Sequence, residues 1–257
     1  MNLCILDSGE SRQRLSLDDR RVRHILGVLK KDVGDRFKAG SPEGLLGWAT
    51  LESRTDDAIA LRFESEGIAP ALRPVQLLLG TVRPIQAARI VKELTILGVQ
   101  GITFFPTELG EKSYTQSNFY IRREYLLHAR DGAEQAGNPR LPEIHLAWSL
   151  RGALDQIAEF APQKPTQTLG DVVRGVPAPP TKIIFHPSDR APLLGDFPLA
   201  GTPIIFAIGT ERGWTEAELA EFARTGFAVC SLGDRILKTE TAAISSTSIV
   251  LARRGFI

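Results

Sequence analysis

The sequence predicts an α/β protein of two parts, a small β-barrel at the amino end and a larger, largely parallel sheet with helices on both faces. Two observations favour this division. Short alternating segments separated by turns occupy residues 35–63, and from residue 75 onward apolar strand patterns alternate with helical patterns. With 257 residues, 43% of them hydrophobic, the chain is long enough for two small cores. Residues 66–74 contain two prolines and form the expected linker, so we predict domains at 1–71 and 72–257.

The composition indicates a globular protein of the cytoplasm. No apolar run approaches the length of a membrane span, and charge at Asp7 comes too early for a signal peptide. Cys4 and Cys230 each lie in an apolar strand pattern, which favours buried free thiols in a reducing compartment. The four histidines show no ligand spacing, so no metal site is predicted. A net charge of +1 argues against a protein that coats nucleic acid without specificity.

The first part begins with a basic helix over residues 20–31, for which Ser16 is the expected cap. Its inward face is apolar, with Val22, Ile25, Leu26 and Leu29. The outer face then carries basic side chains that either contact phosphate or are simply solvated, namely Arg20, Arg21, Arg23, His24, Lys30 and Lys31. Strands are expected over residues 35–39, 46–52 and 56–63, separated by Gly-, Pro- and Asp-rich turns.

The second part alternates strands and helices. Strands are expected over residues 75–81, 102–105, 144–147, 182–186, 203–207 and 227–230. Helices are expected from Pro84 to Gly98, over 118–136 and 149–160, after the capping box Thr215-x-x-Glu218, and over 242–253 with Thr239 or Thr241 as cap. Residues 162–180 are rich in Pro, Gly and Thr and predict a long irregular connection.

Two glycine-bearing loops follow two of these strands. The first loop runs from Ile208 to Trp214, and the second runs from Ser231 to the start of the helix expected over residues 242–253. Backbone N–H groups of such a loop and of a following helix start are free to bind a ligand. Because both loops leave the same ends of parallel strands, we expect them to form one pocket.

The two loops resemble the signature loops of the RsmE family. The segments are Gly209-Thr-Glu-Arg-Gly213 and Leu232-Gly-Asp-Arg-Ile-Leu-Lys-Thr-Glu-Thr-Ala242, against family forms Gly-Pro-Glu-Gly-Gly and Leu-Gly-x-Arg-Ile-Leu-Arg-Thr-Glu-Thr-Ala. Lys238, Thr210 and Arg212 depart from these forms. Residues 97–108 and 133–144 are similar to two further family segments. Ile96 stands where the family has Glu, residues 109–112 stand where it has a basic residue, and Asn138 stands where it has Arg.

The resemblance implies a SPOUT-class methyltransferase with a trefoil knot and an amino-terminal PUA-like barrel. It implies that the cofactor is S-adenosyl-L-methionine and that the protein is a homodimer. It also implies that the methylated atom is N3 of a uridine in 16S rRNA, either in the free RNA or in the assembled small ribosomal subunit. The residues it implies for the cofactor are His186, Pro187, Ile208, Gly209, Glu211, Gly213, Ser231, Leu232, Gly233, Ile236, Leu237 and Thr239.

Methylation of an imide nitrogen requires a group that accepts the N3 proton and a cation for the developing charge. The candidates are Glu211 and Glu240 for the proton and Arg235 for the charge. Glu240 is equally consistent with a favourable first helical turn that pairs with Arg235. For contacts with RNA phosphates we predict Arg21, Arg23, His24, Lys30 and Lys31. Two alternatives stay open: a SPOUT RNA methyltransferase with another target, and an inactive ribosome-binding protein of the same fold.

Overall fold

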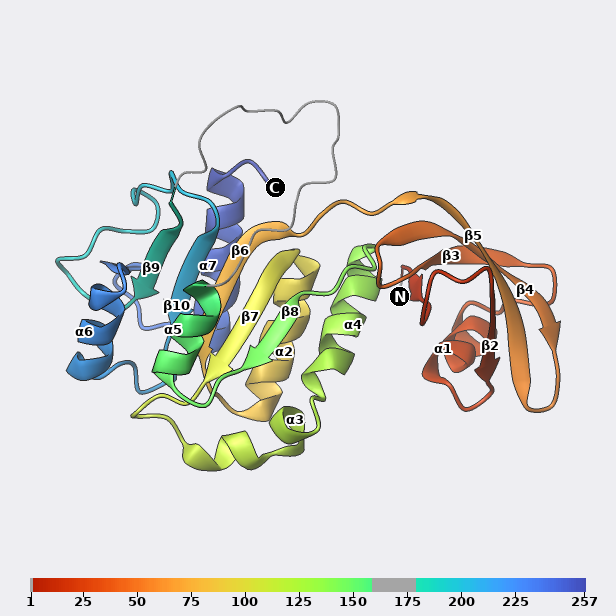
Figure 1. Ribbon diagram of the computed structural model, residues 1–257, viewed down its shortest axis with the longest axis horizontal. Coiled ribbons are helices and arrows are strands. Elements are labelled where there is room, and N and C mark those ends of the chain that lie inside the picture. Colours follow the sequence, from red (N-terminus) through yellow and green to blue (C-terminus); the bar gives the residue numbers. More distant parts are fainter. Residues whose placement is uncertain (1, 159–178) are drawn as a thin grey trace. The chain divides into compact units, whose positions relative to one another are not determined.

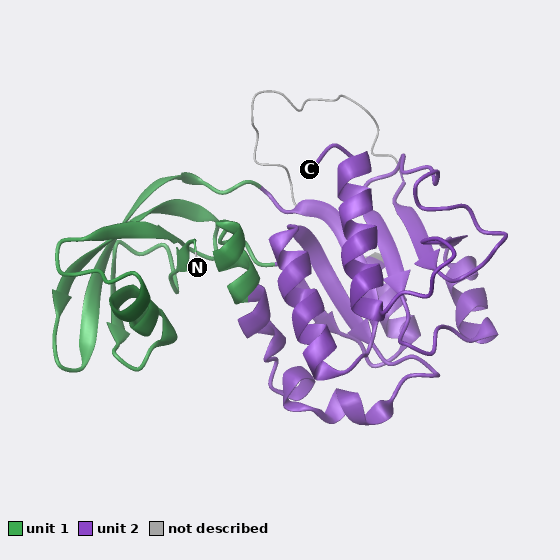
Figure 2. Ribbon diagram, turned by 180° about the vertical axis from the view of Figure 1, so that it is seen from behind, with its two compact units in different colours: residues 1–70, 130–141 green, residues 71–129, 142–257 purple. Residues whose placement is uncertain are grey.

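The structure is a computed structural model that describes residues 2–158 and 179–257. It divides into two compact units, one of residues 1–70 with 130–141 and one of residues 71–129 with 142–257 (Figure 2). The irregular connection predicted for residues 162–180 lies outside the described residues, apart from Pro179 and Pro180. No described helix is both long enough and apolar enough to cross a membrane.

Unit 1 is built on a curled five-stranded sheet (Figure 1). Its strand order is β1-β3-β4-β5-β2, with β1 parallel to β3 and the other neighbours antiparallel. The elements are β1 (Cys4–Ile5), β2 (Arg12–Ser16), α1 (Arg20–Arg23), the π-helical segment η1 (His24–Val28), β3 (Arg36–Gly40), β4 (Leu45–Arg54) and β5 (Ala58–Ile68). The three strands predicted over residues 35–63 are confirmed as β3, β4 and β5.

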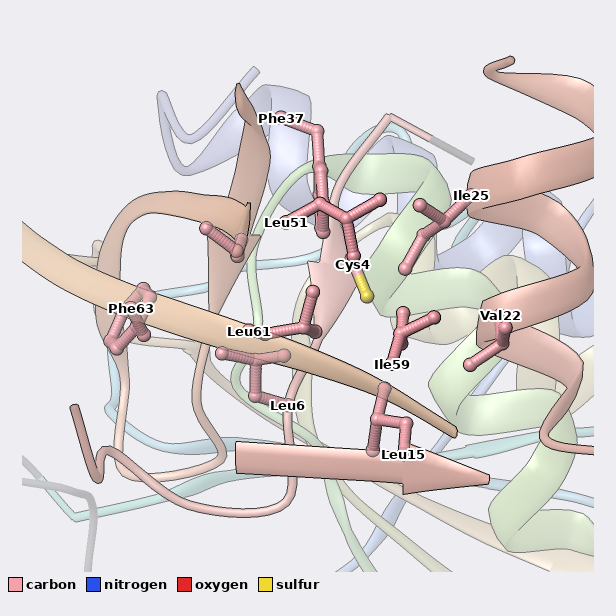
Figure 3. Packing of buried hydrophobic residues seen from close by; sticks show 12 residues of the cluster. Cys4, Leu6, Leu15, Val22, Ile25, Phe37, Leu51, Ile59, Leu61 and Phe63 are labelled. Carbon is pink, nitrogen blue, oxygen red and sulfur yellow. The ribbon is translucent and has the colours of Figure 1, made fainter. Parts of the chain in front are cut away.

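The core of unit 1 follows from the two-residue period of its strands. In β5, Ile59, Leu61 and Phe63 point inward because alternate side chains leave a strand on the same face. They pack with Val22 and Ile25 of the helical segment, and with the Cys4 side chain of β1 (Figure 3). Both cysteines are free and buried, as predicted, and burial raises the pKa of the Cys4 thiol to about 12.

The expected basic helix differs from its prediction in two respects. Ser16 is the last residue of β2, and the N-cap is Asp19, whose carboxylate accepts a hydrogen bond of 2.8 Å from the Arg21 backbone N–H. After Arg23 the helix widens into η1 and ends at Val28, and Lys30 then adopts a positive φ of 50°. A left-handed residue cannot continue a right-handed helix, so the predicted extension to residue 31 is wrong.

Arg21 is buried, with 6% of its surface exposed, and the prediction that it lies on the outer face is wrong. Its guanidinium donates to the carboxylates of Asp7 and Asp19 at 2.6–3.1 Å and to the Ile5 carbonyl at 3.2 Å. A buried guanidinium must have its donors satisfied, and this site satisfies them with two acids and a carbonyl oxygen. Arg21 therefore stabilises unit 1 and is not free to contact phosphate.

Replacing Arg21 with Leu is expected to lower the free energy of unfolding of unit 1 by about 3 kcal/mol, because Asp19 loses the guanidinium that pairs with it and Asp7 retains only the weaker pairing with Arg130. Hydrogen bonds from Arg21 lower the pKa of Asp7 and of Asp19 below 3.8. When folding lowers the pKa of a carboxyl group, the folded state gains stability at every pH above the pKa that the group has in the unfolded chain. That gain disappears as the pH falls through the pKa of the folded state. Urea unfolding from pH 7 to pH 2 should show this acid-linked loss in the wild type and less of it in the variant. The exposed Arg23→Leu is the control, and equal stability of both variants would contradict the prediction.

Residues 130–141 belong to unit 1 through ion pairs and hydrogen bonds. Arg20 pairs with Asp131 at 2.7 Å and with Glu134 at 3.1 Å. Arg130 donates to the Ile5 carbonyl at 2.7 Å. Burial raises the pKa of Glu134, and the charge of Arg20 opposes that shift. These contacts join the end of a helix that is distant in sequence to the amino-terminal strands.

Unit 2 contains a six-stranded sheet in the order β11-β9-β10-β6-β7-β8, in which every neighbouring pair is parallel. The elements from residue 73 onward are β6 (Arg73–Gly80), α2 (Pro84–Ile96), β7 (Val99–Phe105), the 3-10 helix η2 (Lys112–Gln116), α3 (Asn118–Ile121), α4 (Tyr125–Ala136), β8 (Glu143–Leu146), α5 (Leu150–Ala158), β9 (Thr181–Phe185), β10 (Ile204–Ile208), α6 (Glu216–Arg224), β11 (Ala228–Cys230) and α7 (Thr239–Arg253). All of them belong to unit 2 except the part of α4 from Arg130 onward, which belongs to unit 1. The predicted parallel sheet is confirmed.

Helices cover both faces of this sheet. Helices α5 and α6 lie on one face in Figure 1, and α2 and α7 lie on the other in Figure 2. Every residue of β7 and of β10 is buried, as expected for central parallel strands that are covered on both sides. The sheet therefore leaves one edge, formed by the carboxyl ends of its strands, for loops that can bind a ligand.

Two of the predicted helix starts in unit 2 are confirmed. Pro84 is the first residue of α2, and α6 begins with the full capping box between Thr215 and Glu218. The predicted cap of the last helix is wrong, because Lys238 is the N-cap and Thr239 is already helical and buried. The Lys238 carbonyl accepts the first helical hydrogen bond from Ala242 at 2.8 Å, which moves the start to the signature loop itself.

The single helix predicted over residues 118–136 is interrupted between α3 and α4. Arg123 has a φ of 56°, which ends the right-handed path. The break lets Phe119, Tyr120 and Tyr125 all place their rings against Phe104, at centroid distances of 5.3–6.3 Å. Aromatic packing around β7 thus outweighs helix continuity here.

Candidate active site

A cavity of about 290 Å³ lies at the carboxyl ends of β9, β10 and β11. Three separate chain segments form it, and they converge because parallel strands end at the same edge of the sheet (Figure 1). Its volume is at the lower end of the range for small-ligand sites. The lining residues are Phe185, His186, Pro187, Ile208, Gly209, Thr210, Glu211, Arg212, Gly213, Trp214, Ser231, Leu232, Gly233, Arg235, Ile236, Leu237, Thr239 and Ala242.

The loop after β10 is held in shape by its glycines and by Trp214. Gly213 has a φ of 74° and donates its N–H to the Thr210 carbonyl at 2.9 Å, which closes a tight turn. A Cβ on Gly209 would stand 3.1 Å from the Trp214 ring, so the indole packs directly on the backbone. The indole N–H donates to the Phe185 carbonyl at 3.0 Å and ties this loop to β9. The loop therefore forms a closed turn with Arg212 at its second-to-last position.

The loop after β11 turns at Gly233. This residue has a φ of 119°, and a Cβ built on it meets no protein atom within 4 Å. The Ser231 hydroxyl spans the turn, because it accepts from the Gly233 N–H at 3.2 Å and donates to the Gly233 carbonyl at 3.1 Å. The loop thus presents backbone to the cavity where any other residue would present a side chain.

Several groups at this cavity lack a protein partner among the described residues. The Ile236 side chain is 90% exposed, which is unusual for a large aliphatic group. The Nδ1 atom of His186 and the Oγ1 atom of Thr210 are buried without a hydrogen-bond partner. Apolar surface and unpaired polar atoms in one concave site are the features of a binding pocket.

All the residues predicted to hold the cofactor line this one cavity. Arg235 lines it as well, with an exposed guanidinium. Glu240 does not line it: its carboxylate accepts a hydrogen bond of 3.3 Å from the Gln86 amide of α2. The alternative for Glu240, an ion pair with Arg235, is not found among the ion pairs of the described residues, although Glu240 does lie in the first turn of α7. Glu211, in contrast, is exposed at the cavity rim.

A second cavity, of about 440 Å³, lies on the other side of the β10 loop. It is formed at the carboxyl ends of β6 and β7, the next two strands of the sheet. Its lining residues are Arg83, Gln86, Leu109, Gly110, Glu111, Tyr114, Thr210, Glu211 and Arg212. Thr210, Glu211 and Arg212 line both cavities, so this short segment is the wall between them.

Sequence reasoning missed the residues that belong only to this second cavity. Arg83 and Gln86 follow the strand predicted over residues 75–81, so the rule that placed the two signature loops at one edge also applied to them. Tyr114 and Glu111 lie in a segment with no predicted regular structure, and no sequence signal pointed to them.

The residues predicted to contact RNA lie in unit 1 and differ in exposure. Arg23 and Lys30 are exposed, and Lys31 and His24 are half-buried, whereas Arg21 is buried. Burial lowers the pKa of His24, and the charge of Arg20 acts in the same direction. His24 is therefore largely neutral near pH 7, and only Arg23, Lys30 and Lys31 remain as accessible cations of the predicted set.

Residues 70–251 match the family model described as the RNA methyltransferase domain. The chain is 37% identical over 239 residues to ribosomal RNA small subunit methyltransferase E of Treponema pallidum, covering 93% of this chain and 85% of that protein. It is 29% identical over 257 residues to ribosomal RNA small subunit methyltransferase E 1 of Borreliella burgdorferi, covering 98% of each chain.

Among solved structures, it resembles a ribosomal RNA small subunit methyltransferase E from Neisseria gonorrhoeae bound to S-adenosyl methionine. That likeness has a TM-score of 0.75, with 23% identity and 98% of both chains covered, and it supports the fold. The match to the family model over most of the chain and the close relative in Treponema pallidum lead to one conclusion: this chain belongs to the RNA methyltransferases of the ribosomal RNA small subunit methyltransferase E family, RsmE.

Proposed function

We propose that this protein transfers a methyl group from S-adenosyl-L-methionine to N3 of a uridine in 16S rRNA, within the small ribosomal subunit. The observation that carries the proposal is the convergence of both signature loops and His186-Pro187 on one cavity at the carboxyl edge of the sheet. The names of the relatives support a substrate in small-subunit ribosomal RNA.

The residues of the first cavity fit the cofactor. Gly213 and Gly233 leave space that a Cβ would fill, so a ligand can approach their backbone closely. Ile236 and Leu237 supply aliphatic surface for a flat purine ring. Donors and acceptors on the backbone near Ile208 and Leu232 can recognise the edge of that ring. When bound, S-adenosyl-L-methionine supplies an electrophilic methyl group on a sulfonium sulfur.

Glu211 is the proposed base, because its carboxylate is at the wall between the two cavities. Arg235 is the proposed cation on the cofactor side, where it favours negative charge on the uracil carbonyls. Glu240 acts indirectly, because it accepts a hydrogen bond from Gln86, which lines the second cavity. N3 is on the base-pairing edge, so the target uridine must be unpaired or flipped out of its helix.

The finer architecture is also proposed. The proposed domains are residues 1–71 and 72–257. In the first domain, the curled sheet is a PUA-like barrel that helps to hold RNA. The parallel sheet is then a SPOUT domain with a trefoil knot, and the enzyme is a homodimer in which each pocket is completed near the partner chain. The family likeness over most of the chain supports these proposals.

Reversing Arg23, Lys30 and Lys31 to Glu should weaken binding of the small subunit and flatten the dependence of affinity on salt. Each lost phosphate contact removes about one released counterion from the slope of log K against log salt. Arg21 stays unchanged because it is buried and paired. Filter binding at several salt concentrations measures the slope, and calorimetry should give unchanged cofactor affinity. If affinity and slope both survive, this face is only solvated.

The reaction is tested with purified protein, labelled cofactor and small subunits that lack the modification. The RNA is then digested to nucleosides and separated. Label in 3-methyluridine supports the proposal, and label in a ribose or in another base assigns the enzyme to a different target. Bound cofactor without any transfer of label would instead support the inactive ribosome-binding protein.

A further inference from the structure

The two cavities are neighbours along one sheet edge and share a wall. The first cavity is lined by the loops after β9, β10 and β11, and the second cavity is lined by the loops after β6, β7 and β10. A group transfer between two bound molecules requires such a pair of sites, with the reacting atoms meeting at the common wall. Glu211 is part of that wall.

Arg83 is held in the second cavity by a single neutral partner. Its Nε–H donates to the Tyr114 hydroxyl at 2.8 Å, and both residues line the cavity. Among the described residues Arg83 takes part in no ion pair, so no carboxylate neutralises its charge directly. Arg83 is exposed, and this one hydrogen bond orients its guanidinium while leaving other N–H donors free for a ligand.

Two residues that line this cavity have buried polar atoms that find no partner in the described part of the chain. The Thr210 side chain is only 8% exposed, and its Oγ1 is buried without a hydrogen bond. Gln86 donates to Glu240, while its own Oε1 is also buried and unpaired. Leu109 adds apolar surface to these polar groups. A flat, polar-edged ring of the size of a nucleobase suits this mixture.

Uracil presents two carbonyl oxygens on either side of N3. When the N3 proton leaves, the negative charge spreads to these oxygens, and a cation beside one of them lowers the barrier. Arg83 provides that cation in the second cavity, and Glu211 provides an acceptor for the proton at the wall.

We propose that the second cavity receives the flipped target uracil, and that Arg83, held by Tyr114, stabilises the negative charge that develops on a uracil carbonyl. This assignment rests on the proposed function. In the step, the N3–H bond breaks and its proton goes to Glu211. The electron pair left on N3 forms the bond to the methyl carbon, and the sulfur keeps the pair of the broken S–C bond.

The test compares small subunits reconstituted with 16S transcripts that contain either uridine or 5-fluorouridine. Fluorine makes the N3 proton more acidic, so less help is needed from a cation. Arg83→Gln should slow single-turnover methylation of the uridine substrate about 100-fold, and should slow the fluorinated substrate several-fold less. Tyr114→Phe should show the same trend with a smaller loss, because the guanidinium is then unanchored. Arg89→Gln, an exposed arginine of α2 outside both cavities, is the matched control and should behave as wild type.

Calorimetry should give wild-type cofactor affinity for every variant, because Arg83 and Tyr114 do not line the first cavity. An equal loss on both substrates would show that Arg83 only shapes the site and would overturn the assignment. An Arg83 variant as active as the Arg89 control would overturn it as well, while 3-methyluridine formed by the wild type would leave the proposed function standing. If the wild type forms no 3-methyluridine, the proposed function fails and this assignment fails with it.

Discussion

Replacing Gly233 with Val is expected to abolish S-adenosyl-L-methionine binding while unit 2 stays folded. A Cβ at this position meets no protein atom within 4 Å, so its branched side chain would occupy the cavity itself. The φ of 119° lies where L-residues are strained, which adds about 1–2 kcal/mol of destabilisation. We expect affinity in titration calorimetry to fall by at least about a hundredfold, which corresponds to about 2.8 kcal/mol.

Gly226→Val is the control that distinguishes backbone strain from the filling of the cofactor cavity by a side chain. Gly226 also has a positive φ, of 86°, and open space around its Cβ, but it does not line the cavity. The two variants should lose similar thermal stability, and only Gly233→Val should lose the cofactor. Wild-type affinity in folded Gly233→Val would refute the assignment of this cavity to the cofactor.

The second large effect is expected from Glu211→Gln, which removes the proposed base and keeps the size of the side chain. General-base catalysis contributes about 10²–10⁴ in rate, so single-turnover methylation should slow by about that factor. Cofactor affinity should change little, because the side chain is exposed at the rim and forms no hydrogen bond in the described structure. Label transfer to small subunits at saturating cofactor measures the rate.

Glu240→Gln distinguishes this assignment from its rival. Glu240 contacts Gln86 and lines neither cavity, so its amide variant should lose much less activity than Glu211→Gln. The reverse order of losses would identify Glu240 as the proton acceptor and would place Glu211 in a supporting role.

Local patterns in the sequence predicted the elements that depend on near neighbours. The apolar run over residues 203–207 became β10, and the Thr215-x-x-Glu218 spacing became a complete capping box. Both follow from rules that act within a few residues. The predictions that failed needed partners from far along the chain. Burial of Arg21 depends on Asp7, and the break at Arg123 depends on Phe104, neither of which a helical period can reveal.

The sequence by itself determined the alternation of strands and helices, the two signature loops and the family. Only the tertiary structure decided how the loops divide space at the edge of the sheet. The strand order places β10 between β9 and β6, so the loop after β10 borders one cavity on each side. The order of parallel strands is set by packing between distant segments, and it brings Arg83 and Glu211 to one cavity although about half the chain separates them. Residues 130–141 likewise join unit 1 because the half-buried side chains of Arg20 and Arg130 find partners that lie far away in the sequence.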